Sequence, residues 1–302
     1  MIISVEHKFG TLVFIVMTIA HLIIAHKDPP QLERLVKRLI HRKSDIYIHL
    51  DKKVNITGYR YLADLGRVYF IKGRILCTWG GFSLVKAITH SVKEILNSSR
   101  RYEYINLISA QDYPIKSLDS FYHHIQDSNG KSYIPYEAVE GSSWWKHAVS
   151  RYELYHFTDI RIRGKYIVQH VLNKYLPKRR FPLPYDLYGS PSATWWTLHR
   201  DCLRYVIDFL AEEPNLMRFM KYTWGADEFL FPTIIMNSPF RDSVENTNFR
   251  RIEFPAGKAN PKVYVTEDFD ELIRSDCFFA RKFDIKVDAK ILDLLDGSCL
   301  RH

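Results

Sequence analysis

One carboxylate in this 302-residue chain stands in a setting suited to general base catalysis. Glu228 follows Gly225-Ala226-Asp227 and lies near Trp224, at the expected start of a helix. A general base needs an accessible carboxylate on rigid structure, and a helix start can supply that support. An acidic residue in a first helical turn also stabilises the helix dipole, by up to ~1 kcal/mol, without any catalytic role. The spacing alone leaves both roles open.

A lysine near the end of the chain is the second candidate. Lys282 follows Arg281 in an aromatic segment that runs from Phe278 to Phe283. One interpretation is a cation fixed beside an anionic ligand. The other is a surface lysine that lays its stem along apolar side chains.

The sequence offers no convincing metal or cofactor site. Asp268-Phe269-Asp270 has the Asp-x-Asp form that can hold a divalent cation, but it lies between Glu267 and Glu271 at an expected helix start, where acids favour the dipole. The thirteen histidines are dispersed and the four cysteines form no CxxC pair. P-loop, GxGxxG, HExxH and GxSxG motifs are absent. We therefore expect no metal and no bound cofactor.

Hydrophobic patterning predicts the elements that must position these side chains. Short apolar runs predict strands at 22–25, 46–50, 68–71, 104–108 and 194–199, and helical periodicity predicts helices near 29–40, 84–96 and 202–210. Alternating strands and helices indicate an α/β fold with a mostly parallel central sheet flanked by helices. Ligands bind beyond the carboxyl ends of such strands. We therefore expect a ligand-binding edge at the carboxyl ends of the predicted strands, formed by His26-Lys27-Asp28, Asp51-Lys52-Lys53 and Gln111-Asp112.

Composition limits the possible partners and location. The net charge of +9 suggests an anionic partner, and a nucleic-acid or polyanion binder is the non-enzymatic alternative, although no nucleic-acid-reading motif is present. The apolar run 11–25 is short for a bilayer span and contains His21, so we expect no span, with peripheral membrane contact left open. The scattered cysteines fit a reducing compartment.

Several segments, in order, resemble one known family. They are His26-Lys27-Asp28-Pro29, Ile48-His49-Leu50-Asp51, Trp79-Gly80-Gly81-Phe82-Ser83, residues 105–115 around Gln111-Asp112, Gly189-Ser190 with Trp195-Trp196-Thr197-Leu198, Asp227-Glu228-Phe229 with Asn237-Ser238, and residues 279–284. The resemblance is to the core-2/I-branching β-1,6-N-acetylglucosaminyltransferases, a family that includes the peptide O-xylosyltransferases. The resemblance covers roughly residues 17–285, and the chain looks like a bacterial-type member.

The resemblance implies a single glycosyltransferase A-type domain that inverts the anomeric carbon and needs no metal. It implies a UDP-sugar donor, most readily UDP-N-acetylglucosamine with UDP-xylose as the alternative, and a glycan or lipid-linked saccharide acceptor. By position, Glu228 matches the catalytic base, Asp51 the acid on the uridine side, and Lys282 a cation that holds the donor diphosphate. The remaining implied site residues are Lys262 as a second diphosphate cation, and Arg151, Asp112, Asp227 and Trp196 toward the substrates.

The resemblance also suggests how the chain is organised. Residues 1–16 form an extension before a domain at 17–302, with a nucleotide-sugar half at 17–125 and an acceptor and catalytic half at 126–302. Since neither an adequate anchor nor a rich cysteine set is present, we expect a cytoplasmic protein that can lie peripherally on the inner face of the membrane.

Overall fold

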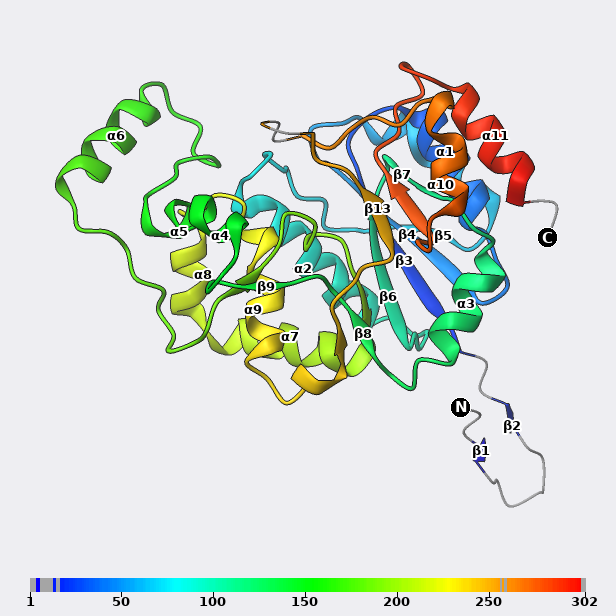
Figure 1. Ribbon diagram of the computed structural model, residues 1–302, viewed down its shortest axis with the longest axis horizontal. Coiled ribbons are helices and arrows are strands. Elements are labelled where there is room, and N and C mark those ends of the chain that lie inside the picture. The colour runs from blue at the N-terminus through cyan, green and yellow to red at the C-terminus, as the bar shows by residue number, and fades with distance from the viewer. Residues whose placement is uncertain (1–3, 6–12, 15–16, 256, 258–259, 300–302) are drawn as a thin grey trace.

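A seven-stranded mixed sheet forms the centre of the molecule in the computed structural model, which describes residues 4–5, 13–14, 17–255, 257 and 260–299 (Figure 1). The strands run in the order β12-β8-β11-β6-β3-β4-β5. Their bounds are β3 (Ile19–Ala25), β4 (Ser44–Leu50), β5 (Val68–Phe70), β6 (Tyr104–Ser109), β8 (Ser132–Tyr133), β11 (Thr197–His199) and β12 (Val244–Glu245). β3 pairs in parallel with β4 and β6, and β4 with β5, whereas β11 runs antiparallel to β6 and β8. The predicted α/β fold with a mostly parallel sheet is confirmed.

Helices cover both faces of this sheet because its central strands are apolar on both sides. Leu22 and Ile24 of β3 pack into one core cluster with α2 and α7, and Ile23 and Ala25 pack into the other with α1 and α3. The helices are α1 (Pro29–Leu39), α2 (Phe82–Leu96), α3 (Leu118–Gln126), α4 (Ser143–Ala148), α5 (Ser150–Glu153), α6 (Lys165–Tyr175), α7 (Arg200–Glu212), α8 (Pro214–Met220), α9 (Leu230–Met236), α10 (Phe269–Arg274) and α11 (Lys290–Cys299). Short 3-10 turns are η1 (Ile56–Leu65), η2 (Ala226–Glu228), η3 (Arg241–Ser243) and η4 (Thr266–Asp268).

A second, three-stranded sheet returns the C-terminal part of the chain to the end of β6. It has the order β13-β14-β7, with β13 (Arg250–Ile252), β14 (Phe279–Arg281) and β7 (Asp112–Pro114). Arg281 is paired opposite Asp112 in the β14–β7 ladder. This sheet therefore carries the Arg281-Lys282 pair to the same edge as the loop that follows β6.

A row of buried polar side chains joins the two sheets. Arg250 donates to the side chain of Asn106 and to the carbonyl of Leu107, and the Nδ2 of Asn106 lies 2.9 Å from Nδ1 of His21. Burial, together with the charge of Arg250, lowers the pKa of His21 to about 3. The imidazole is neutral at ordinary pH, so its Nδ1 accepts from Asn106 and its Nε2 donates to Tyr122.

Two further strand pairs form separate two-stranded sheets. β9 (Glu137–Ala138) pairs with β10 (Tyr188–Gly189), and β1 (Ser4–Val5) pairs with β2 (Val13–Phe14). Most of the predicted 1–16 extension lies outside the described residues, and the division into halves at 125/126 stays a prediction. Within the described part of the chain, no helix is long and apolar enough to span a bilayer.

Candidate functional site

A cavity of about 370 Å³ opens at the carboxyl ends of β3, β4 and β6. His26, Asp51 and Gln111, each just beyond one of these strands, line it. Glu228 and Lys282 line the same cavity, although 53 residues separate them in the sequence. The predicted ligand edge thus exists, and the two residues on which the sequence argument depended meet there.

A tight turn before η2 places Glu228 at the cavity wall. Gly225 has a left-handed φ of 62°, and a Cβ atom there would lie 2.9 Å from Nη1 of Arg151. Its amide donates to the carbonyl of Gly80 at 2.8 Å, which ties the turn to the loop before α2. Glycine fits because L side chains are strained at this φ and because the space is occupied. Glu228 ends the 3-10 turn η2, and the α-helix α9 begins only at Leu230, with Pro232 in its first turn, so the expected helix starts after Glu228 rather than at it.

The carboxylate of Glu228 is mostly enclosed and has one cationic partner. Arg151 Nη1 donates to Glu228 Oε2. Burial raises the pKa of Glu228 to about 7, and Arg151 opposes that rise. A carboxyl group with a pKa near neutrality can exchange a proton under ordinary conditions, which is the property a general base needs.

Asp227, next along the turn, is buried more deeply. Its Oδ2 accepts from the Thr194 hydroxyl at 2.6 Å, while its Oδ1 has no hydrogen-bond partner among the described residues. Burial raises the pKa of Asp227. Asp227 and Thr194 both line the cavity, and the unpaired Oδ1 itself is buried.

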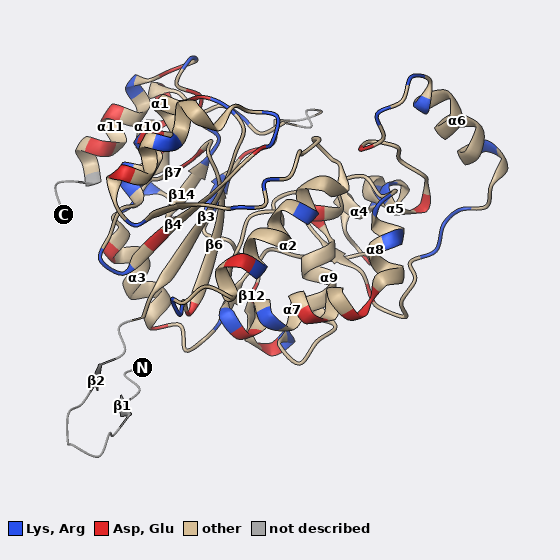
Figure 2. Ribbon diagram, turned by 180° about the vertical axis from the view of Figure 1, so that it is seen from behind, with Lys and Arg blue, Asp and Glu red and all other residues tan. Residues whose placement is uncertain are grey.

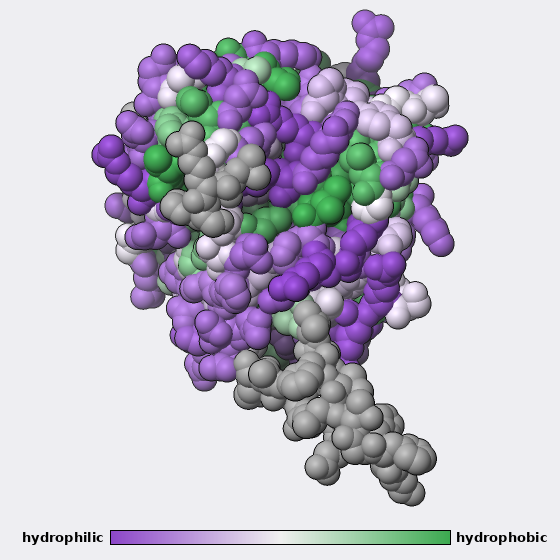
Figure 3. All heavy atoms as spheres, turned by 90° about the vertical axis from the view of Figure 1, so that its right-hand side faces the viewer, coloured by the Kyte–Doolittle hydropathy of each residue, from purple (hydrophilic) through white to green (hydrophobic). Residues whose placement is uncertain are grey.

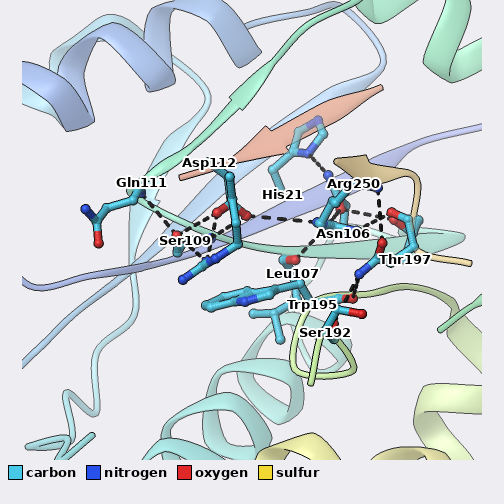
Figure 4. Close-up of polar contacts among 12 residues, drawn as sticks. His21, Asn106, Leu107, Ser109, Gln111, Asp112, Ser192, Trp195, Thr197 and Arg250 are labelled. Atoms are coloured by element: carbon cyan, nitrogen blue, oxygen red, sulfur yellow. Dashed lines mark hydrogen bonds and ion pairs between the residues drawn. The ribbon is translucent and has the colours of Figure 1, made fainter. Parts of the chain in front are cut away.

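Two adjacent cations face the carboxylates from the end of β14. Arg281 Nη1 donates to Asp112 Oδ1 at 2.9 Å and to Ser109 Oγ at 2.8 Å, and its guanidinium lies 4.4 Å from the centroid of Trp195. Figure 4 shows Asp112, Ser109 and Trp195 gathered at this point beside the buried row of Asn106 and Arg250. Partial burial and the neighbouring cations Arg281 and Lys27 lower the pKa of Lys282. Buried or partly buried cations of this kind suit an anionic ligand.

The far wall holds Asp51 just after β4. Its Oδ1 accepts from the amide of Lys53 at 2.9 Å, and its Oδ2 lies 3.3 Å from the amide of Cys77 and 3.2 Å from Nζ of Lys53. Burial and the nearby Asp51 raise the pKa of the Cys77 thiol to about 12, so this cysteine is not a reactive thiolate. Asp51 lines the cavity, and its role on the uridine side stays a prediction.

Three predicted site residues lie away from the cavity. Lys262 follows the lining residue Pro261 but directs its Nζ to Asp268 Oδ1 at 2.6 Å, so its charge is already paired, and its role as a diphosphate cation stays a prediction. Arg281, next to Lys282, does line the cavity. Trp196 is fully buried against Phe231, and it is the preceding Trp195 that lines the cavity. Asp112 is also buried, and it contacts Arg281 rather than open space.

Arg151 occupies an intermediate position. It binds Glu228 directly and lies over Trp224, but it does not itself line the cavity. Its predicted contact with an acceptor stays a prediction.

Several residues that line the cavity could not be identified as site residues from the sequence. Trp195 and Trp196 precede the three-residue strand β11, too short a pattern to show which ring faces the core. Trp79 and Gly80 were noted as part of a motif, but no spacing indicated that they would line the cavity. Among the described residues there is no cluster of three or more His, Cys, Asp or Glu side chains able to hold a metal ion.

The comparison with known families decides where the chain belongs. The sequence pattern described as Core-2/I-Branching enzyme matches residues 19–274, which span the cavity-lining turn at Glu228. The chain belongs to the Core-2/I-Branching enzyme family. The resemblance found in the sequence is thereby confirmed for the family.

Relatives of this family member carry xylosyltransferase names. The chain is 26% identical to Xylosyltransferase 2 of Rattus norvegicus over 304 residues, and 24% identical to Xylosyltransferase 1 of Canis lupus familiaris over 302 residues. Each alignment covers 92% of this chain, and it covers 33% and 30% of the two relatives. This family member therefore spans about a third of the length of the curated relatives it matches. A solved structure of mouse Xyloside xylosyltransferase 1 is similar with a TM-score of 0.41 and 10% identity, over 87% of this chain and 97% of that one.

Proposed function

We propose that this protein is an inverting, metal-independent A-type glycosyltransferase that moves a sugar from a UDP-sugar to a hydroxyl of an acceptor. The observation that carries the proposal is that Glu228, with its pKa near 7, shares one cavity with the cations Arg281 and Lys282. Membership of the Core-2/I-Branching enzyme family supports the same reaction class.

The proposed chemistry needs two things from the protein. As the acceptor oxygen bonds to the anomeric carbon, the bond from that carbon to the diphosphate breaks, and the hydroxyl proton passes to Glu228. The departing UDP gains negative charge, which Arg281 and Lys282 are placed to stabilise. A single base suffices for direct displacement with inversion, whereas a glycosidase needs a second catalytic carboxyl group at a defined separation.

Two donors remain in view. The sequence resemblance favours UDP-N-acetylglucosamine, whereas the xylosyltransferase names of the relatives favour UDP-xylose. The acceptor class we propose is a glycan or lipid-linked saccharide on the cytoplasmic side. The free thiols of Cys77, Cys202 and Cys277 are consistent with a reducing compartment.

UDP release from a panel of donors tests the proposal. We expect the full chain to bind UDP, to be stabilised most by its true donor in a thermal-shift assay, and to keep its activity in EDTA. Glu228→Gln removes the base but preserves shape, so transfer is lost while UDP still stabilises the fold. The matched control Glu212→Gln, on the exposed end of α7, keeps full activity.

The opposite results are equally clear. Activity that returns only on addition of Mn²⁺ would contradict the metal-free mechanism. Tight, steeply salt-dependent oligonucleotide binding with no response to any UDP-sugar would favour the polyanion-binding alternative instead.

A further inference from the structure

An arm of residues 160–185 projects from the side of the molecule formed by α4, α5 and α8, and it carries α6 at its tip (Figure 1). The arm contains seven Lys and Arg residues and no Asp or Glu. Figure 2 shows α6 itself with basic but no acidic positions. Arg161, Arg163 and Arg180 form no ion pair or hydrogen bond with any residue that the structure describes.

The same arm exposes apolar side chains at helical spacing. Ile167, Val171 and Tyr175 lie at i, i+4 and i+8 along α6, so they form one stripe, and they are 72%, 46% and 73% exposed. Neighbouring exposed apolar residues are Ile162, Tyr166, Val168 and Leu176. The surface at the other end of the molecule, around α11, is mainly hydrophilic apart from a band of hydrophobic side chains (Figure 3). A run of exposed apolar residues of this kind marks an interaction site.

Hydrogen bonds fix which way this stripe faces. On the opposite side of α6, Gln169 Oε1 accepts from the amide of Phe157 at 2.8 Å, and Asn173 exchanges two hydrogen bonds with the backbone of Tyr155. At the root of the arm, Arg179 donates to the carbonyls of Leu154 and Tyr222. The polar face of α6 is therefore occupied by the protein, and the apolar stripe is held outward.

We propose that this arm docks the protein on the surface of an anionic lipid bilayer. A helix with a basic flank and an apolar stripe containing Tyr lies in the interface plane of a membrane, with the stripe among the acyl chains. Basic residues next to such a helix are attracted to anionic headgroups. Lys178 is paired with Glu153, whereas Arg161, Arg163 and Arg180 have no acidic partner among the described residues. α6 has eleven residues, so it can lie on a bilayer but not cross it.

The positive charge of the arm argues against a second copy of this chain as the partner that covers the apolar stripe. In a symmetric dimer the same surface meets itself, so Arg161, Arg163 and Arg180, which have no acidic partner among the described residues, would approach their own copies. An anionic bilayer satisfies both the stripe and the cations.

The root of the arm also connects to the cavity. Asp159 accepts from the amide and the hydroxyl of Ser83, at 2.8 Å and 2.6 Å, and the next residue, Leu84, lines the cavity. When the arm is docked, the bilayer therefore lies on the side of the molecule that carries Ser83 and the cavity-lining Leu84. The docking proposal itself does not depend on the reaction proposed above.

Co-sedimentation of the full chain with vesicles tests the proposal. We expect binding to phosphatidylcholine vesicles that contain phosphatidylglycerol, weaker binding to phosphatidylcholine alone, and release by high salt. Arg161→Gln/Arg163→Gln/Lys174→Gln weakens binding to the anionic vesicles at least about tenfold, since each cation near the surface contributes. Ile167→Ser/Val171→Ser/Tyr175→Ser removes the stripe and releases the protein at low salt as well. All six positions are on the arm, and Ile167, Val171 and Tyr175 are already solvent-exposed, so circular dichroism and UDP binding stay as in the parent protein.

A matched control separates the arm from net charge. Arg60→Gln/Lys72→Gln/Lys93→Gln removes three exposed cations from the body and leaves vesicle binding within about threefold of the parent, because these cations are not joined to an exposed apolar stripe. The proposal is overturned if the parent protein ignores anionic vesicles, if the arm variants bind like the parent, or if sedimentation velocity shows a dimer that the stripe variant dissociates.

Discussion

The guanidinium of Arg151 binds the carboxylate of Glu228 while its Cζ lies 4.4 Å from the centroid of the Trp224 ring. Arg151 thereby opposes the effect of burial, which raises the pKa of Glu228 to about 7. The same arginine holds the turn at Gly225, where its side chain fills the space a Cβ would need. One cation thus fixes both the position and the proton affinity of the proposed base.

The first prediction concerns the pH dependence of transfer. A base must be ionised to accept a proton, so kcat/KM rises with pH and levels off above about 7, the pKa of Glu228. In Arg151→Met the stabilising cation is lost, the pKa of Glu228 moves higher, and the rising limb moves to higher pH. Activity then falls most at acidic pH and recovers in alkaline buffer.

The measurement is a full pH profile of both proteins, with Lys221→Met as a control that removes an exposed cation. An unmoved limb in Arg151→Met would show that Arg151 does not tune the group that limits the rate at low pH.

The second prediction concerns the support of Arg281. Ser109→Ala removes the hydrogen bond from Arg281 Nη1, worth about 1 kcal/mol, together with the hydroxyl's bonds to Asp112 and from the Gln111 amide, and it leaves the contact of Arg281 with Asp112 in place. We expect KM for the donor to rise about fivefold with kcat little changed, because the cation binds the diphosphate less firmly. Asp112→Asn is more severe, since it leaves Arg281 and the buried Arg250 without their carboxylate, and unfolding becomes easier by about 3–5 kcal/mol.

Donor titrations on Ser109→Ala, with Ser98→Ala in the turn after α2 as control, measure the first effect, and urea unfolding of Asp112→Asn measures the second. A donor KM that stays at the parent value in Ser109→Ala would remove Arg281 from donor binding.

The third prediction separates two neighbouring tryptophans. Trp195 lines the cavity beneath Arg281, whereas Trp196 is fully buried in the core. Trp196→Ala leaves a large hole and lowers the free energy of unfolding by about 3–5 kcal/mol, while its folded fraction keeps donor affinity. Trp195→Ala weakens donor binding with a smaller loss of stability.

Urea unfolding and donor titration on both variants distinguish the two roles. Equal losses of stability with equal donor affinity would place both rings in the core and take Trp195 out of the site.

The sheet and its ligand edge could be predicted from the sequence because they follow from strong local patterns. The runs ending at Ala25, Leu50 and Ser109 are largely apolar and buried on both faces, and a polar residue follows each of them within two positions. The direction of the Lys262 side chain could not be predicted, because it is set by an ion pair with Asp268, which lies in the turn η4. α6 could not be recognised as an exposed arm, since Ile167 and Val171 have the periodicity of a core helix and only the folded structure shows that nothing described covers them.

The last prediction compares the two lysines that the family resemblance assigned to the diphosphate. Lys282 lines the cavity, and Lys262 is paired with Asp268 outside it, although the backbones of the two residues are joined by hydrogen bonds. Lys282→Met removes a positive charge from the leaving-group site, so we expect kcat to fall at least about a hundredfold, because a charge that acts on the transition state lowers the barrier by about 3 kcal/mol or more. Lys262→Met removes the same charge from the neighbouring loop before η4 and leaves kcat within about threefold, since its loss costs at most the small free energy of a partly exposed ion pair. Steady-state kinetics at saturating donor measure both values, and far-UV circular dichroism confirms that both variants fold. Equal losses in the two variants would indicate that Lys262, like Lys282, acts on the diphosphate.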